Sequence, residues 1–135
     1  MKTITIRSAV ESLLSAGLGG YQFFKTRPNN LVHDPENGQT DLPACAIYFE
    51  SGATDDDYLD ETTWSASIHV ELFQAQDTGV DDLLEADAQT VIDALNQTDL
   101  NGLVEYIRSP KFTYNRDPET DVTALDLTFT LQWEE

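Results

Sequence analysis

The densest cluster of ionisable side chains in the sequence is the run DDDYLDE, which spans residues 55–61. Carboxylates this close repel one another unless a cation, a basic partner or bulk water screens them. A calcium-binding EF-hand loop would need Asp or Asn at its fifth position, Gly at its sixth and Glu at its twelfth. Counted from Asp55, those positions hold Leu59, Asp60 and Ala66. The run therefore does not match an EF-hand. An irregular, weak divalent-cation site stays open, and a solvated loop is the favoured interpretation.

The other reactive residue types form no recognisable catalytic group. The chain has no G-x-S-x-G motif, and its histidines are His33 and His69. His69 falls on the polar side of an alternating segment, which predicts a surface or interface residue. Cys45 lies within an apolar segment and is predicted to be an inert core residue. With 25 acidic residues in the chain, choosing a pair for glycoside hydrolysis would be arbitrary. We expect no enzyme activity and no bound cofactor.

Hydrophobic spacing predicts the strands that position the acidic run. Residues 43–51 carry apolar side chains on both faces, which is typical of a strand inside a sheet. Residues 62–73 alternate between apolar and polar side chains, which indicates a strand with one covered face. Residues 52–62 are then the loop of a β-hairpin. Residues 125–134 alternate in the same way and predict another strand with one polar face.

Apolar residues at helical spacing predict two main helices, at residues 4–16 and 80–96. A third, short helix is predicted at residues 100–107. Because each alternating strand has one apolar face, the helices should cover one face of the sheet. The fold class is therefore α+β, with a mostly antiparallel β-sheet and two main helices packed on one face, in a single domain at 1–135. The remaining predicted segments are a strand at 21–24, a polar loop at 29–42, a strand at 111–115 and a turn at 115–121.

Composition limits the possible partners. The chain has 135 residues, 25 acidic and seven basic, and its formal net charge is −18. This charge disfavours tight binding to DNA, because neutralisation of phosphates is the main source of affinity for a duplex. No apolar run of 18 residues predicts a membrane span, and the first residues do not resemble a secretory signal peptide. A single cysteine cannot form an internal disulfide, which is consistent with a reducing compartment.

Arg27 and Arg116 are rare positive charges in this acidic chain. We expect each guanidinium to pair with carboxylates. The sequence leaves open whether these carboxylates belong to the same subunit or to a neighbouring one.

The order and spacing of several motifs resemble one known family. In chain order these motifs are FFKTRP (23–28), LPACAIYF (42–49), TWSASIHVELF (63–73), FTYNRD (112–117) and LDLTFTLQWE (125–134). Together they are similar to the minor tail protein U family, the tail terminators of lambda-like siphophages, over nearly the whole chain. The sequence differs in segment 29–41, which is longer than the usual connection, and in having NRD where a more basic pair is expected.

The resemblance implies a structural virion protein that forms a homohexameric ring on the head-proximal end of the tail tube. Such a ring stops polymerisation of the tube and presents a surface to the head-completion proteins. Assembly would take place in the cytoplasm of the bacterial host. The positions that the resemblance suggests as assembly interfaces are Arg27, Pro28, Asp55, Asp56, Asp57, Asp60, Glu61, Arg116 and Asp117.

A ring also gives the acidity a physical purpose. Carboxylates around the lumen would let DNA pass without binding, since DNA is itself densely charged. Six such subunits would repel one another, so salt, magnesium or the tube end is expected to promote the ring. The acidic hairpin loop either lines the lumen or docks on a partner. The alternative from another class is a monomeric acidic module that binds a basic protein, as a DNA mimic or inhibitor does.

Overall fold

The computed structural model describes residues 1–29, 31–55 and 62–135, with the side chain of Asp55 excepted. The elements are α1 (Thr3–Ser15), β1 (Gln22–Phe24), β2 (His33–Asp34), a 3-10 helix (Pro35–Asn37), β3 (Gln39–Thr40), β4 (Ala44–Asp55), β5 (Thr63–Ala75), α2 (Val80–Leu95), β6 (Arg108–Asp117) and β7 (Val122–Glu134). The main sheet has the strand order β1-β4-β5-β7-β6.

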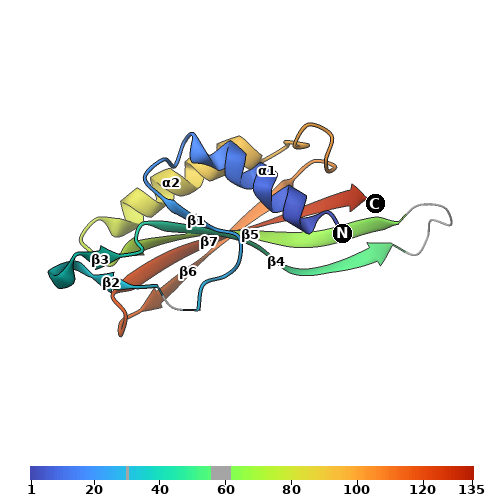
Figure 1. The fold of residues 1–135 in the computed structure, drawn as a ribbon. Helices are drawn as coiled ribbons and strands as arrows, with labels where there is room; N and C mark the ends of the chain where they lie inside the picture. The colour runs from blue at the N-terminus through green and yellow to red at the C-terminus, as the bar shows by residue number, and fades with distance from the viewer. Residues whose placement is uncertain (30, 56–61) are drawn as a thin grey trace.

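Both helices lie on one face of this sheet, as the alternating strands predicted (Figure 1). Strands β4, β5, β7 and β6 are antiparallel neighbours, and only the short β1 pairs in parallel, with the start of β4. The predicted fold class, α+β with a mostly antiparallel sheet and two helices on one face, is confirmed. No helix in the described ranges is long and apolar enough to cross a membrane.

The main core lies between the helices and the sheet. One apolar stripe of α2 is buried there and consists of Val80, Leu84, Ala88, Val91 and Leu95. Its spacing of three and four residues keeps all five side chains on one side of the helix. From the sheet, the alternating positions of β5 and β7 supply Ile68, Val70, Leu127 and Phe129, which are at most 2% exposed. The periodicity of the sequence thus defines this core.

The opposite face of the sheet is less polar than the sequence indicated. Ala44, Ala46, Phe73, Val122 and Ala124 form a second, smaller apolar cluster there. It is covered in part by four side chains from neighbouring segments, namely Phe24, Leu31, Leu42 and Tyr48. The apolar residues on both faces of the start of β4 belong to these two clusters. The strand is internal, as predicted, where β1 pairs with Ala44–Ala46, but beyond Ala46 it pairs with β5 alone among the described residues.

The short helix predicted at 100–107 is wrong, because the chain there forms turns and bends. Leu100, Asn101 and Gly102 have φ values of 52°, 58° and 87°, and three successive left-handed residues cannot continue a right-handed helix. Asp99 Oδ1 also accepts a hydrogen bond from the backbone N–H of Asn101, a local interaction that favours a turn. The apolar residues of this segment reach the core without helical geometry.

Three other boundaries differ from the predicted ones. Segment 29–42 contains the small β2–β3 ribbon as well as loop, and Gly38 adopts a φ of 68° at its turn. Strands β4 and β5 extend to Asp55 and Thr63, so the hairpin connection is shorter than predicted. Strand β6 begins at Arg108 and ends at Asp117, which places Arg116 and Asp117 on the strand instead of in a turn.

The neighbours Leu83 and Leu84 on α2 provide a matched test of this packing. Leu84 is fully buried, whereas Leu83 is 48% exposed. We expect Leu84→Ala to lower the free energy of unfolding by about 2–5 kcal/mol, because it removes buried methyl groups and leaves a cavity. Leu83→Ala should change it by less than about 0.5 kcal/mol. Urea unfolding followed by circular dichroism measures both, and equal losses in the two variants would contradict the assigned orientation of α2.

Candidate assembly surface

A buried carboxylate, Glu71, lies at the centre of the sheet face that the helices leave uncovered. Its residue is only 1% exposed. Strand β5 presents it there because Glu71 alternates with Val70 and Leu72, which face the main core. A carboxylate at such a position needs several donors, since burial without them is costly.

Three neighbouring segments supply those donors. The Tyr48 hydroxyl, from β4, donates a hydrogen bond to Glu71 Oε1 at 2.8 Å. The side-chain amide of Asn115, from β6, donates to Oε2 at 3.4 Å. Arg27, from the segment after β1, places its Nε 3.5 Å from Oε1. The carboxylate therefore joins two strands and a loop that are distant in sequence.

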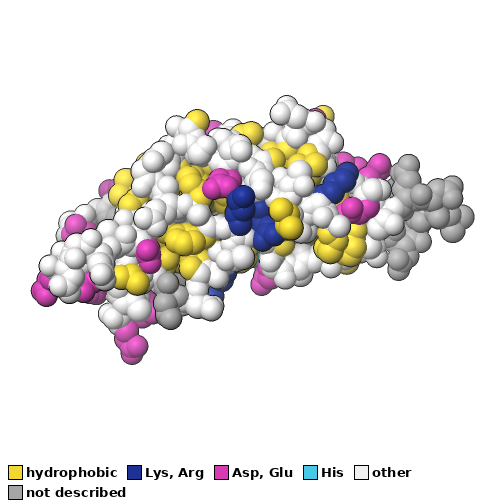
Figure 2. All heavy atoms as spheres, in the orientation of Figure 1, with side chains coloured by type: hydrophobic (Ala, Val, Ile, Leu, Met, Phe, Trp, Pro, Cys, Tyr) yellow, Lys and Arg dark blue, Asp and Glu magenta, His cyan; other side chains and the backbone are white. Residues whose placement is uncertain are grey.

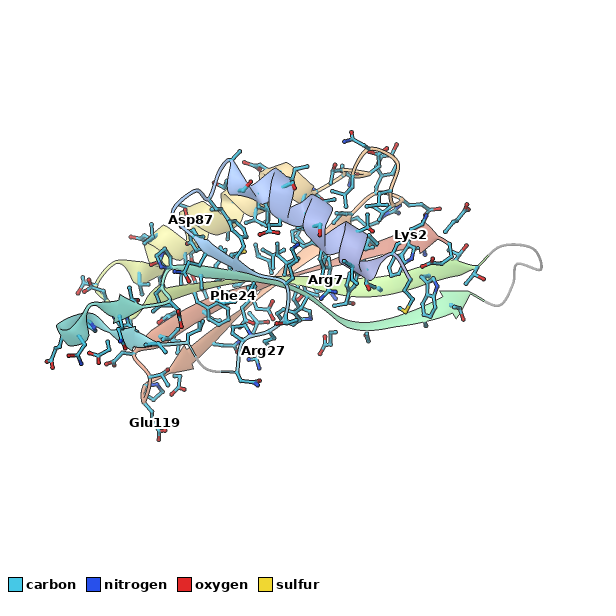
Figure 3. All side chains as sticks on the ribbon, in the orientation of Figure 1. Lys2, Arg7, Phe24, Arg27, Asp87 and Glu119 are labelled. Carbon is cyan, nitrogen blue, oxygen red and sulfur yellow. The ribbon has the colours of Figure 1, made fainter. Side chains whose placement is uncertain are left out.

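These contacts also alter the acid–base properties of the donors. The charge of Glu71 raises the pKa of Arg27 further above its usual value. Burial, followed by the hydrogen bond to Glu71, raises the pKa of Tyr48 well above 10.0, so the phenol stays protonated and remains a donor. The Arg27 side chain is nonetheless 63% exposed. In Figure 3, Arg27 lies on the side of the sheet opposite to α1.

A second polar group lies beside Glu71 on the same face. His69 Nδ1 is 2.8 Å from Asp126 Oδ2, and Nε2 is 2.9 Å from Glu50 Oε2. Its ring stacks on Tyr48, with the ring centroids 4.9 Å apart. Glu50 lies at the irregularity in register between Phe49 and Ser51 of β4. His69 thus links β4, β5 and β7.

The structure contradicts the predicted surface position of His69, which is only 8% exposed. Burial acts to lower the pKa of His69, but the hydrogen bonds to Glu50 and Asp126 outweigh it and raise the pKa above its usual 6.5. Burial raises the pKa of Asp126, and its bond to His69 opposes this effect. Protonation of His69 lets both ring nitrogens donate to carboxylates.

Arg116 is engaged on the other side of the sheet. Its two terminal nitrogens donate to Asp81 Oδ1 and Oδ2, each at 2.8 Å, and so tie β6 to the first turn of α2. The guanidinium also lies 4.6 Å from the centre of the Tyr114 ring. The hydrogen bonds from Arg116 lower the pKa of Asp81. Both arginines that the sequence singled out therefore have carboxylate partners within the subunit.

The predicted interface residues form three groups along the chain: Arg27 with Pro28, the acidic run, and Arg116 with Asp117. The two groups that contain an arginine lie close together in the structure. Arg27, Pro28, Arg116 and Asp117 line one hollow of about 520 Å³ on the surface of the subunit. Its remaining walls include Leu31, Phe73, Val122 and Ala124, which belong to the second apolar cluster. The backbone of Asp55 ends β4 opposite Thr63, and Asp56, Asp57, Asp60 and Glu61 lie outside the described residues.

Sequence reasoning did not identify Glu71, Tyr48, Asp126 or the partners of His69. Alternation along β5 and β7 does place His69, Glu71 and Asp126 on the polar face. What it lacks is the register, which sets Glu71 opposite Asp126 and His69 opposite both Tyr48 and Thr128. The available signal was the presence of His69, Glu71 and Asp126 together on the face predicted to be polar.

Cys45 is fully buried in the main core, as predicted, and burial raises the pKa of its thiol to about 12. Within the part of the chain that the structure describes, no three His, Cys, Asp or Glu side chains are grouped in a way that could hold a metal ion.

The fold and surface define an α+β subunit that presents an open, charged sheet face. The chain belongs to the phage minor tail protein U family, whose match spans residues 1–133. It is therefore a phage tail protein. Similar curated proteins are the tail tube terminator protein of Escherichia phage lambda, 29% identical, and that of Escherichia phage N15, 27% identical. Each comparison covers 99% of both proteins.

A chain in the solved virion of a native gene transfer agent particle has the same fold. The TM-score is 0.65, and the match covers 96% of this chain and 94% of that chain at 17% sequence identity. At this identity the likeness concerns the fold.

The donors to Glu71 can be tested with two tyrosines. Tyr48→Phe removes one hydroxyl donor and leaves a buried carboxylate oxygen less well satisfied, so the free energy of unfolding should fall by about 1–3 kcal/mol. Tyr106 is 54% exposed, and Tyr106→Phe should change it by less than about 0.5 kcal/mol. Urea unfolding at neutral pH measures both. A Tyr48→Phe variant as stable as the wild type would mean that the hydroxyl is not needed.

The raised pKa of His69 predicts that the stability of the fold depends on pH. Because its pKa in the folded protein is raised, its protonation adds stability that is fully present below the unfolded value of 6.5 and is lost as the pH rises through the folded value. We expect the free energy of unfolding to fall more between about pH 6 and pH 8.5 in the wild type than in His69→Gln. His33→Gln is the control and should keep the slope of the wild type. A slope unchanged by His69→Gln would show that His69 does not titrate in this way.

Proposed function

We propose that this protein is a tail tube terminator. It forms a homohexameric ring at the head-proximal end of the phage tail tube, stops growth of the tube and provides the surface for head attachment. The observation that carries the proposal is the similarity to two tail tube terminator proteins over 99% of each chain. The expected partners are further copies of the chain, the tail-tube protein and a head-completion protein.

The arrangement of charges supports a role for the acidic surface in this ring. Helix α2 carries Asp81, Asp82, Glu85, Asp87 and Asp93 and no basic residue. In an acidic lumen, repulsion between carboxylates and phosphates would prevent DNA from adhering during its passage. Figure 2 shows Lys and Arg side chains in separate groups on one face, one near its middle and one to the right, each with Asp or Glu side chains beside it.

The net negative charge makes assembly of the ring depend on the ionic conditions. Six copies at −18 each carry −108 in total. Self-repulsion of this size favours separate subunits at low ionic strength, and screening or an added contact favours the ring. Magnesium is proposed here as a promoter of assembly, not as a catalytic cofactor.

A monomeric acidic module that binds a basic protein remains the second candidate, because the net charge of −18 also fits a DNA mimic. The two candidates differ in assembly. A terminator needs a closed ring of copies related by rotation, whereas a DNA mimic acts as a monomer or dimer.

Sedimentation velocity and negative-stain imaging test the proposal directly. We expect a monomer in low-salt buffer with a chelator, and a sixfold annulus when magnesium chloride is added. Sodium chloride at matched ionic strength is the control that separates general screening from an effect of the divalent ion. A protein that stays monomeric under every condition and on tail-tube ends would overturn the proposed ring and favour the second candidate.

A further inference from the structure

All the basic residues of the chain lie near the two outer edges of the main sheet or on α1. Lys25 and Arg27 follow β1, which is one edge strand, and Arg7 of α1 donates a hydrogen bond to the backbone carbonyl of Lys25. Arg108, Lys111 and Arg116 lie on β6, the other edge strand. The seventh is Lys2, at the start of α1. Strands β4, β5 and β7 contain none.

Strand β6 is an unusually open edge. Nine of its ten residues are exposed and the tenth, Tyr114, is partly buried. Phe112 is 68% exposed although it faces the same side of the sheet as the buried Leu127. Beyond the irregularity between Arg108 and Lys111, the strand pairs regularly with β7 up to Asp117. Its outer side has backbone groups available to another strand, which makes such an edge a ready template for association.

Strand β4 is open on its outer side for most of its length. The parallel pairing with β1 ends at Phe24 and Ala46, and from Ile47 to Ala53 the strand pairs only with β5 among the described residues. Whereas β6 carries three basic residues, β4 contains Glu50 and Asp55 and no Lys or Arg. The two open edges therefore differ in charge.

Strand direction determines how two copies could meet. Strands β4, β5, β7 and β6 are successively antiparallel, so β4 and β6 of one subunit run in opposite directions. A rotation about an axis roughly along the strands keeps the direction of each strand. It therefore brings β4 of the next copy beside β6 in the antiparallel sense, which is the more favourable pairing.

We infer that the subunits of the proposed ring join edge to edge: β6 of one copy pairs antiparallel with the outer side of β4 of the next. This contact is heterologous. In the proposed ring a rotation of one sixth of a turn repeats it until the ring closes, and the exposed edges of β6 and β4 are then paired. The inference rests on the proposed ring and specifies how its subunits bind one another.

The alternation of side chains between the two sheet faces, together with the charges of the two edges, selects one register for the pairing of β6 with β4 of the next copy. Ala53 and Thr113 both lie on the face opposite to the helices, because Ala53 is opposite Ser65 and Thr113 is opposite Asp126. If Ala53 of one copy is paired with Thr113 of the next, Ser51 meets Asn115 and position 55 meets Lys111. Asp55 of one copy and Lys111 of the next have opposite charges, and their attraction offsets part of the repulsion between copies.

Cysteine cross-linking can test this register. In a variant with both Ala53→Cys and Thr113→Cys, positions 53 and 113 of one chain are separated by three strand spacings, about 14 Å, across the sheet and by about 20 Å along the strands. An internal disulfide would need the Cα atoms within about 7 Å. Directly opposed residues on antiparallel strands are about 4.5–5.5 Å apart. Mild oxidation under ring-forming conditions should therefore give a ladder of linked chains that ends at six on a non-reducing gel.

The control variant carries Ala53→Cys with Gln89→Cys, since Gln89 is exposed on α2, away from both edges. It should give no ladder under the same conditions. The buried Cys45 is common to both variants and to the wild type, which should stay unlinked. If the wild type forms annuli but the Ala53→Cys, Thr113→Cys variant does not cross-link, the edge contact is wrong and the proposed function stands. If the wild type forms no annulus at all, the proposed ring itself fails.

Exchanging the charges at positions 55 and 111 gives an independent test of the proposed register. Lys111→Glu or Asp55→Lys alone should reduce the fraction of subunits in rings at a given magnesium concentration, and the two together should restore it. Lys2→Glu changes the net charge as much as Lys111→Glu does and lies off the sheet edges, so it controls for total charge. Equal losses for Lys2→Glu and Lys111→Glu, with no restoration in the double variant, would overturn the register.

Discussion

The uncovered face of the sheet is organised around the need to satisfy one buried carboxylate. Glu71 is 1% exposed and is held by Tyr48, Asn115 and Arg27. The ion pair itself contributes little net stability because Arg27 is largely exposed, but leaving the buried carboxylate of Glu71 without donors would be costly. The network therefore serves mainly to specify positions: it fixes the segment after β1 beneath the sheet and keeps Arg27 next to the end of β6.

This constraint explains why the second face of the sheet is neither a full core nor a fully solvated surface. The small apolar cluster around Phe73 is covered only in part, by Leu31 and its neighbours. Beside it, His69 joins the carboxylates of Glu50 and Asp126 across three strands. Hydrogen bonds between charged groups give this face a defined shape without a second layer of helices, which leaves it available to solvent or to another protein.

Much of the fold could be predicted from periodicity, because the stripe of α2 and the alternation of β5 and β7 repeat one pattern over many residues. The turns at Leu100–Gly102 could not, since backbone conformations with positive φ leave little trace in the pattern of apolar residues. The proximity of Arg27 to Arg116 was equally inaccessible. It depends on the path of the segment after β1, which leaves the edge of the sheet and brings Arg27 to Glu71 of β5 and to the hollow that Arg116 also lines. The resemblance to a family identified both arginines, but the structure supplies the different partner of each.

Open sheet edges in an acidic protein pose a problem that the proposed ring would resolve. An edge that pairs with any other strand leads to fibres, so natural proteins limit such pairing with bulges, prolines and charges. Both edges here carry such features: Pro110 and the φ of 58° at Ser109 interrupt β6, and the irregular register at Glu50 interrupts β4. The regular stretches between these interruptions are short, and self-repulsion opposes non-specific contacts. In the proposed ring, pairing is favoured only where opposite charges meet in one register, and growth stops because six equal rotations complete a full turn.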